Sequence, residues 1–231
     1  MLKIEQLNQY YSESHTLWDI DMQLETGKCN CLMGRNGVGK TTLLNCIMGL
    51  QAVRSGHMTF DGQDLIKANA EKRASMGIGY VPQGRQIFPL LTVKENLQIG
   101  LGARKDKSKQ IPDFIYELFP VLKDMLGRRG GDLSGGQQQQ LAIGRALVID
   151  PSLLILDEPT EGIQPNIVQE IGDIIKKLSS EIGLTVLLVE QKLPIVRRIA
   201  DNFSILDRGR KVAAGQIDEL SDELIKQYLT V

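Results

Sequence analysis

The chain has 231 residues, of which 42% are hydrophobic and 24% are charged, a composition typical of folded globular proteins. Lys and Arg total 27 against 28 Asp and Glu, so the formal net charge is -1, which argues against a protein that binds nucleic acid through a basic surface. No stretch approaches the ~20 consecutive apolar residues that cross a bilayer, and the first residues lack the apolar core of a secretory signal, so we expect neither a membrane span nor secretion.

The first third of the chain is predicted to be rich in strands. Alternating apolar residues predict strands over 2–7 and 17–25, and a short apolar run over 28–34 ends at a glycine. A helix is predicted from Lys40 to Gly49, where apolar residues recur at helical spacing. The next run, 56–65, has the pattern of a strand, an Asp-Gly turn and a second strand.

Helical patterns dominate from about residue 92 to 149, after a short apolar strand over 78–83. Thr92 and Glu95 have the spacing of a capping box, and IPDFIYELFPVL and QQQQLAIGRALVI are further predicted helices. Strand patterns then return at 153–157, 184–190 and 203–207. Continuous apolar strands that alternate with helices are typical of a parallel sheet covered on both faces, so we expect an α/β core with an inserted helical segment.

The three cysteines, Cys29, Cys31 and Cys46, form no CxxC pair. An odd count without such a pair argues against a disulfide framework and against a zinc site. We therefore expect three buried thiols in a reducing compartment.

Residues 34–41, GRNGVGKT, match the pattern GxxxxGK[ST] between a predicted strand and a predicted helix. In such a loop glycines let backbone N–H groups point at phosphate oxygens, and the helix N-terminus adds positive partial charge. We expect Lys40 to reach the β- and γ-phosphates and the Thr41 hydroxyl to bind Mg²⁺, with Thr42 on the α-phosphate side. The residues predicted to hold a nucleotide are Gly34, Asn36, Gly37, Gly39, Lys40, Thr41 and Thr42. A glycine-rich surface turn with a solvated lysine is the alternative, which the flanking strand and helix disfavour.

The apolar strand 153–157 ends in two acids, Asp157 and Glu158. The carboxyl end of such a strand is where α/β sheets bind ligands. Asp157 suits a Mg²⁺ ligand, direct or through water, and Glu158 suits the group that positions and polarises an attacking water. A pair of exposed turn acids is the alternative, which four preceding apolar residues and a phosphate loop disfavour.

A second glycine turn, LSGGQ, opens the predicted helix within GGDLSGGQQQQLAIGRAL. Taken alone, it is either an anion-binding helix N-terminus or a helix cap formed by Asp132 and Ser134. Together with GxxxxGKT upstream and Asp157 downstream, it resembles the ATP-binding-cassette (ABC) family over nearly the whole chain. The resemblance implies a P-loop NTPase (RecA-like) α/β core with an antiparallel β edge and an inserted helical subdomain. It implies one nucleotide-binding domain over 1–231, with 1–84 and 149–231 as the core and 85–148 as the helical subdomain.

The resemblance also implies roles for residues outside the phosphate loop. Two cassettes of this family dimerise head to tail, so Ser134, Gly136 and Gln137 would contact a γ-phosphate held by the second subunit. Gln83 matches the glutamine that senses Mg²⁺ and the γ-phosphate. Tyr11 matches the aromatic residue that stacks on adenine, with simple packing as the alternative.

Two positions depart from the family pattern. Gln191 stands where a switch histidine is usual, and its amide can donate to a γ-phosphate but cannot carry a proton. Gln164 stands where many cassettes have Asp, in the loop that communicates between the two nucleotide sites, so two identical copies need not form two competent sites. His15 and His57 lie upstream in no matching context, and we expect ordinary surface or turn histidines there.

Two runs of the chain, LLVEQ and DEPTEGIQP, resemble the importer branch for branched-chain amino acids and their relatives, whose importers use two different ATPase subunits. The runs VPQGRQIFPLLTVKENL and GGDLSGGQQQQLAIGRAL are most similar to the ATP-binding subunit of urea importers. The resemblance implies ATP and Mg²⁺ as cofactors and Glu158 and Gln191 as catalytic residues. It implies a second ATPase subunit, two permeases, indirectly a solute-binding protein, and a peripheral place on the cytoplasmic face of the inner membrane. The expected solute is urea, with branched-chain amino acids as the alternative.

Other readings of the sequence stay open in part. The apolar run 87–91 is either a dock for a helix of a membrane subunit or core of the helical subdomain. An ABC ATPase acting on DNA or ribosomes is disfavoured by the single cassette and the absence of a basic excess, and a small-molecule kinase would leave LSGGQ without a role. A non-catalytic ATP-binding switch remains an alternative because of Gln164 and Gln191.

Overall fold

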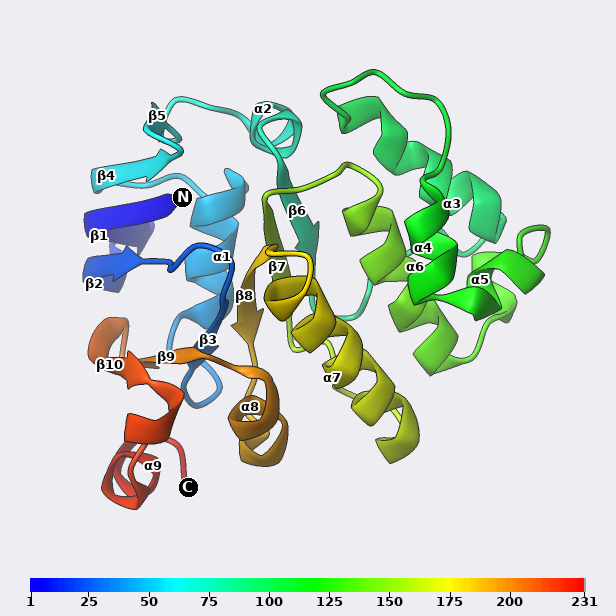
Figure 1. Cartoon of the computed structure of the whole chain (residues 1–231). Coiled ribbons are helices and arrows are strands. Elements are labelled where there is room, and N and C mark those ends of the chain that lie inside the picture. Colours follow the sequence, from blue (N-terminus) through cyan, green and yellow to red (C-terminus); the bar gives the residue numbers. More distant parts are fainter. Residues whose placement is uncertain (231) are drawn as a thin grey trace.

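The computed structural model describes residues 1–230. Its strands form two sheets, which Figure 1 shows side by side with helices between and beyond them. The first sheet has the order β2-β1-β4-β5, and all of its pairs are antiparallel. Its strands are β1 (Leu2–Tyr11), β2 (Ser14–Gln23), β4 (Ser55–Phe60) and β5 (Gln63–Asp64). This sheet is the expected antiparallel edge, and the predicted strand–turn–strand at 56–65 is confirmed.

The second sheet has the order β10-β9-β3-β8-β7-β6. All of its neighbouring pairs are parallel except β9 with β10. Its strands are β3 (Cys29–Met33), β6 (Ile78–Val81), β7 (Leu153–Asp157), β8 (Thr185–Val189), β9 (Asn202–Asp207) and β10 (Arg210–Gln216). Every residue of β3, β7 and β8 is buried, as the continuous apolar runs predict for strands covered on both faces.

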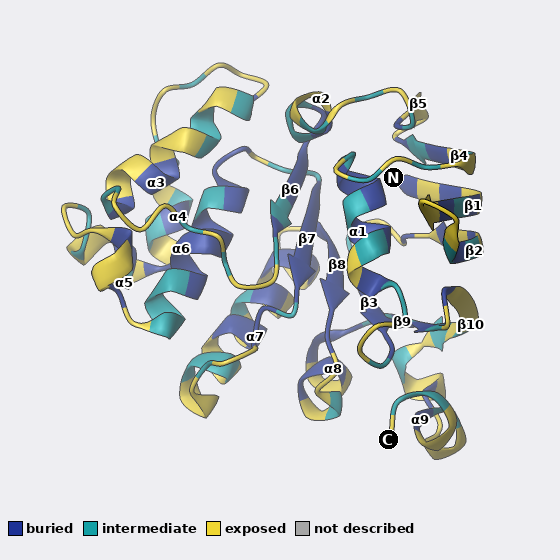
Figure 2. Cartoon of the chain, turned by 180° about the vertical axis from the view of Figure 1, so that it is seen from behind, coloured by how far each residue is buried: buried dark blue, intermediate teal, exposed yellow. Residues whose placement is uncertain are grey.

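Helices cover both faces of this sheet, which lies dark blue in the middle of Figure 2. Successive strand residues point to opposite faces, so one sheet contributes to two cores. Leu153 and Ile155 of β7 pack with α1 and the antiparallel sheet, whereas Leu154 and Leu156 pack with α6, α7 and α8. These helices are α1 (Lys40–Met48), α6 (Gly135–Leu147), α7 (Pro165–Ser180) and α8 (Leu193–Ile199).

The remaining helices are short. They are α2 (Ala70–Ser75), α3 (Val93–Gly100), η1 (Leu101–Ala103), α4 (Asp113–Leu118), α5 (Pro120–Asp124), η2 (Gly130–Asp132), η3 (Ile217–Glu219) and α9 (Asp222–Tyr228). The predicted capping box at α3 is confirmed, since the Thr92 side chain accepts from the Glu95 N–H and the Glu95 carboxylate accepts from the Thr92 N–H. One predicted helix, IPDFIYELFPVL, is broken in two at Phe119, because Pro120 has no N–H with which to continue the helix.

The helices α3 to α6 gather on one side of the molecule, on the right in Figure 1. They lie between β6 and β7 in the chain and within the interval 85–148. The division of the chain into a core and a helical subdomain stays a prediction. One of the two hydrophobic cores contains residues from both parts, whereas the other contains no residue of 85–148. Within the described residues, no helix has the length and apolar character needed to cross a membrane.

The three cysteines are free and buried, as expected. Burial raises the pKa of the Cys29 and Cys46 thiols to about 12, so both are inert as nucleophiles.

Candidate functional site

The loop between β3 and α1 wraps around its own lysine. The Lys40 ammonium donates to the carbonyl oxygens of Gly34 at 2.8 Å and of Arg35 at 3.0 Å, and the side chain is only 6% exposed. Gly34 adopts a φ of 148°, and a Cβ there would lie 2.3 Å from the carbonyl oxygen of Leu206. A glycine is therefore required at this point, because the loop passes directly over β9.

Lys40 faces the two acids that follow β7. Its Nζ lies 3.7 Å from Oε1 of Glu158. Burial lowers the pKa of Lys40, and the charges of Glu158 and Asp157 partly oppose this shift. The lysine and the carboxylates, 118 residues apart in the chain, thus meet because β3 and β7 both border β8 and end at the same edge of the sheet.

Asp157 is the last residue of β7 and is 2% exposed. Its Oδ2 accepts from the Thr41 hydroxyl at 3.4 Å. Burial, together with the neighbouring charge of Glu158, raises the pKa of Asp157 to about 6. A buried carboxylate with a single long hydrogen bond beside a hydroxyl is a set of oxygen donors that suits Mg²⁺, so these residues fit the metal expected from the sequence.

Glu158 has a left-handed backbone, with a φ of 48°, and its N–H donates to the carbonyl of Val189 at 2.9 Å. The Gln191 side chain holds its carboxylate. Nε2 of Gln191 donates to Oε1 of Glu158 and to Oδ1 of Asn36, the latter at 2.7 Å. An amide has two protons to donate, and Gln191 donates both to side chains of this chain. The expected donation from Gln191 to a phosphate would require one of these bonds to open, and that role stays a prediction.

These groups surround a cavity of about 360 Å³ at the carboxyl edge of the parallel strands. Gln83, which follows β6, lies at the cavity and donates through Nε2 to Oε2 of Glu161 at 2.8 Å. The cavity is lined by Thr16, Asn36, Gly37, Gly39, Lys40, Thr41, Thr42, Gln83, Glu158 and Glu161. Eight of the predicted site residues are therefore brought together in one place, while Gly34, Asp157 and Gln191 contact the lining residues from behind.

Sequence reasoning missed two of the lining residues, Thr16 and Glu161. Glu161 lies in the run TEGIQP, three residues after the second predicted acid, which is a signal that sequence analysis could have used. Thr16 lies on β2, and its neighbour Leu17 closes on Gly39, where an added Cβ would lie 2.9 Å from Cδ2 of Leu17. No local pattern marks Thr16, because only the packing of the first sheet against the loop brings it there.

Tyr11 does not line this cavity. It is 45% exposed at the end of β1, and its predicted stacking on adenine stays a prediction. Its neighbour Tyr10 stacks on His15 at 4.0 Å, and His15 stacks on Trp18 at 3.4 Å between ring centroids. The expectation of an ordinary surface or turn histidine is confirmed for the exposed His57, whereas His15 is half-buried in this column of rings on the edge strand β2.

The residues of LSGGQ also lie outside the cavity lining, at the start of α6. The Ser134 side chain accepts from the Gln137 N–H, and the Gln137 side chain accepts from the Ser134 N–H at 2.9 Å. Gly136 allows α6 to approach α7, since a Cβ there would lie 2.8 Å from Cγ2 of Ile167. Within one chain these residues form a helix cap, and the predicted contact with a second subunit's nucleotide stays a prediction.

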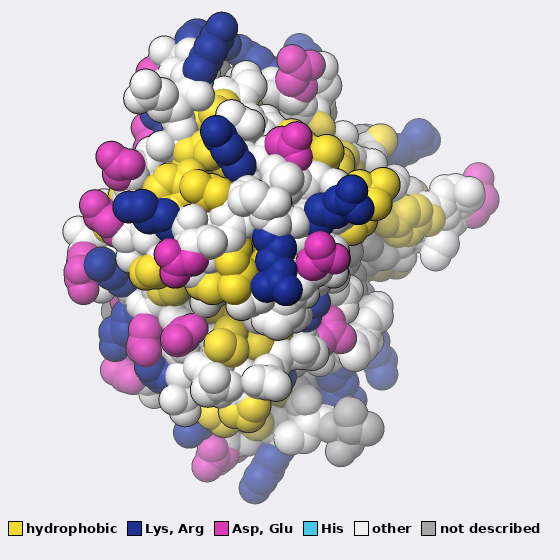
Figure 3. Space-filling model, turned by 90° about the vertical axis from the view of Figure 1, so that its right-hand side faces the viewer, with side chains coloured by type: hydrophobic (Ala, Val, Ile, Leu, Met, Phe, Trp, Pro, Cys, Tyr) yellow, Lys and Arg dark blue, Asp and Glu magenta, His cyan; other side chains and the backbone are white. Residues whose placement is uncertain are grey.

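The apolar run 87–91 is partly core and partly exposed surface, so it fits each of the two predictions, core and dock, in part. Ile87 packs against the core, whereas Phe88 and Leu90 are 45% and 79% exposed. Phe88 lines an apolar groove of about 390 Å³ between α2, β6, α3 and α6, and the Arg145 guanidinium lies 5.2 Å from its ring centroid. Seen from the side of α3 and α5, the surface carries hydrophobic patches between charged side chains (Figure 3).

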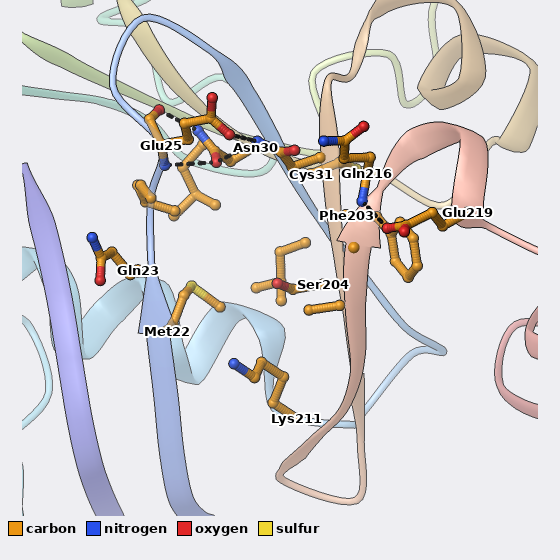
Figure 4. Close-up of a pocket in the computed structure, with 16 residues that line it drawn as sticks. Met22, Gln23, Glu25, Asn30, Cys31, Phe203, Ser204, Lys211, Gln216 and Glu219 are labelled. Atoms are coloured by element: carbon orange, nitrogen blue, oxygen red, sulfur yellow. Dashed lines mark hydrogen bonds between the residues drawn. The ribbon is translucent and has the colours of Figure 1, made fainter.

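A second cavity, of about 350 Å³, lies between β2, β3, β9 and β10 (Figure 4). Asn30 borders it and is satisfied within the chain, donating to the carbonyls of Glu25 and Lys28 and accepting from the Glu25 N–H. None of the predicted site residues lines this cavity. The candidate site is therefore the cavity at the phosphate loop.

Comparison with known proteins gives consistent results. Residues 17–161 match the family model described as ABC transporter. The chain is 40% identical over 213 residues to the high-affinity branched-chain amino acid transport ATP-binding protein BraG of Pseudomonas aeruginosa, covering 92% of this chain and 91% of that protein. It is 38% identical over 221 residues to the probable branched-chain amino acid transport ATP-binding protein LivF of Archaeoglobus fulgidus, covering 95% and 94%. Among solved structures, a nucleotide-free ATP-binding cassette from an ABC transporter has a TM-score of 0.83 and 28% identity, covering 99% of this chain and 94% of that one.

Proposed function

The chain belongs to the ABC transporter family as an ATPase whose hydrolysis of ATP is coupled to transport, and from this premise we propose that it powers the import of branched-chain amino acids. The observation that supports the solute is the 40% and 38% identity to two proteins named for branched-chain amino acid transport. Urea, which the sequence favours, has no support from these two relatives. The solute assignment rests on relatedness and not on the chemistry of the cavity.

The meeting of Lys40, Thr41, Asp157 and Glu158 around one cavity carries the proposed mechanism. Lys40 binds the β- and γ-phosphates of ATP, exchanging its contact with Glu158 for them, and the loop amides bind the remaining phosphate oxygens. Thr41, Asp157 and Gln83 would hold Mg²⁺, which when bound neutralises charge between the phosphates. Glu158 then orients and polarises the attacking water, and Gln191 keeps its carboxylate in place.

We place the chain in a larger assembly. Ser134, Gly136 and Gln137 of one subunit complete the nucleotide site of a second ATPase subunit. The departures at Gln164 and Gln191 favour a different protein, and not a second copy of this chain, as that subunit. Two permeases bind at the groove lined by Phe88, and a solute-binding protein acts through them. The chain then lies peripherally on the cytoplasmic face of the inner membrane.

The substitution Glu158→Gln tests the catalytic part of the proposal. Hydrolysis of ATP by the chain assembled with its second ATPase subunit should fall by about a hundredfold or more, since positioned acid–base groups contribute 10²–10⁴-fold. Binding of a fluorescent ATP analogue should persist, because Lys40 and the loop are intact. Glu161→Gln, at the same cavity, should lower the rate of ATP hydrolysis far less. Hydrolysis by Glu158→Gln at the wild-type rate would contradict the assignment. A wild-type chain that binds ATP but does not hydrolyse it even with its second ATPase subunit would favour the non-catalytic switch.

Uptake by cells that lack the gene tests the solute. Accumulation of radiolabelled leucine should fall and that of urea should not. The wild-type gene should restore leucine uptake, and a Lys40→Ala copy should fail, because the lysine is needed for ATP binding. Loss of urea uptake with normal leucine uptake would reverse the assignment.

A further inference from the structure

Glu190 lies directly after β8 and is 2% exposed, yet none of the roles above uses it. Its backbone continues the strand, with its N–H directed at the carbonyl of Leu32 on β3 at 3.4 Å. An acid buried in this way is costly unless its oxygens are fully hydrogen-bonded. The partners of the carboxylate therefore indicate why an acid is present.

Four donors from two loops converge on the Glu190 carboxylate. Oε1 accepts from the hydroxyl of Thr160 and from the Thr160 N–H at 3.3 Å. Oε2 accepts from the N–H of Gln191 at 2.9 Å and from the N–H of Lys192 at 3.2 Å. Thr160 is buried two residues after Glu158, and Gln191 begins the loop after β8. The carboxylate thus ties together the two loops that carry the proposed catalytic pair.

The chemistry of the contact explains the choice of residue. A carboxylate accepts at both oxygens and can bind four donors at once, whereas an amide of the same shape presents an NH₂ group to one of the two loops. Three of the four donors are backbone N–H groups, which can only donate, whereas the Thr160 hydroxyl can also accept. A glutamine at this position therefore leaves at least one donor facing another donor.

We propose that Glu190 is a positioning residue for ATP hydrolysis: its buried carboxylate holds the backbone of Gln191 and the loop at Thr160 so that the Gln191 amide reaches Glu158 and Asn36. Glu190 acts through Gln191 and does not touch the nucleotide. The inference rests on the proposed roles of Glu158 and Gln191. It gives the Glu190 carboxylate the task of holding the two loops in place.

The test compares Glu190→Gln with the wild-type chain, each measured in the assembled transporter. We expect kcat for ATP hydrolysis to fall about tenfold or more, since small displacements of catalytic groups cost rate steeply. KM for ATP and binding of a fluorescent ATP analogue should stay within about threefold, because the phosphate loop is untouched. Hydrogen exchange, measured on the same samples, should quicken in peptides covering 158–164 and 188–193 and not in those covering 34–42.

A matched control is Lys192→Met. The Lys192 ammonium donates to the carbonyl of Thr160 at 2.8 Å and so joins the same two loops without contacting the Glu190 carboxylate through its side chain. This variant should keep kcat within about threefold. An equal loss of kcat in Lys192→Met would show that any loosening of the loops suffices, and would overturn the specific role of Glu190.

A double variant separates this inference from the function on which it rests. If Glu190 acts through Gln191, the pair Glu190→Gln with Gln191→Ala loses no more kcat than Gln191→Ala alone. Losses that multiply, or wild-type kcat and exchange in Glu190→Gln, overturn the inference. If Glu158→Gln hydrolyses ATP normally, the proposed catalytic assignment fails instead, whatever Glu190→Gln does.

Discussion

At the scale of single residues, hydrogen bonds between polar side chains hold the site together. Gln191 joins Asn36 of the phosphate loop to Glu158 after β7. An amide keeps its protons throughout the physiological pH range, unlike a histidine side chain. Asp157 behaves differently, because burial raises its pKa to about 6 and places its change of charge near neutrality.

Asp157 should therefore make stability depend on pH. Its raised pKa means that the folded chain binds this proton more tightly than the unfolded chain, so the ionised carboxylate costs stability above pH 6 and the cost disappears below about pH 4. In the absence of nucleotide, Asp157→Asn should raise the free energy of unfolding at pH 7.5 by at most about 3 kcal/mol. Its amide oxygen can still accept from Thr41.

Denaturant unfolding at pH 7.5 and pH 4.5 measures this difference, and comparison with wild type at each pH cancels the titration of other acids. The gain from Asp157→Asn should shrink by more than half at the lower pH. A gain that is equal at both values would show that another property of the substitution, and not the charge of Asp157, is responsible.

At the scale of elements, the residues that begin α6 have both a structural role and a proposed role in nucleotide binding. Ser134 and Gln137 cap the helix reciprocally, and Gly136 lets it approach α7. The same residues are proposed to contact the nucleotide of a second subunit. Any substitution here alters the helix as well, so loss of activity alone does not establish contact with a nucleotide.

Two substitutions of Ser134 separate these duties. Ser134→Ala should lower the free energy of unfolding by about 1 kcal/mol, because the side-chain cap is lost. Ser134→Asn should keep most of the stability, since Asn caps helices about as well as Ser. If Ser134 also contacts a nucleotide across a dimer, ATP hydrolysis in the assembled transporter should stay impaired in both. Hydrolysis that recovers along with stability in Ser134→Asn would limit Ser134 to the cap.

At the scale of the whole molecule, the cavity and the apolar groove are joined by a short segment. Gln83 lies at the cavity, and Phe88 lines the groove five residues later. Arg145 of α6 holds the segment between them, since its Nη2 donates to the carbonyl of Gln86 at 2.8 Å and its guanidinium lies over the Phe88 ring. A partner bound at the groove would therefore contact the same short segment that carries Gln83 at the proposed γ-phosphate site.

Phe88→Asp should weaken binding of the permeases without altering the nucleotide cavity. An aspartate at this position removes buried apolar area from the contact and adds the cost of desolvating a charge. Co-purification with the membrane subunits should therefore fall at least about tenfold. ATP binding by the isolated chain should not change. The matched control is Ile182→Asp, since Ile182 is another exposed apolar residue, 55% accessible after α7 and away from the groove. Equal co-purification of both variants would rule out this dock.

Local sequence patterns predicted those parts of the protein that depend on neighbours in the chain. The phosphate loop, the acids Asp157 and Glu158, the cap at Thr92 and the buried parallel strands all follow from local patterns: glycine where the backbone needs it, a capping spacing, and apolar runs of strand length. The fold class was predictable for the same reason. The break at Phe119 followed from a local signal too, since Pro120 was visible in the sequence.

Contacts between residues far apart in the chain depend instead on the three-dimensional fold. Gln191 and Asn36 are 155 residues apart, and they bond because the strand order β3-β8-β7 places three loops at one edge of the sheet. Thr16 reaches the cavity through the packing of the antiparallel sheet, and Glu190 acquires its two Thr160 donors from the loop after the neighbouring strand β7. Such contacts depend on strand order and side-chain direction, which no local pattern encodes.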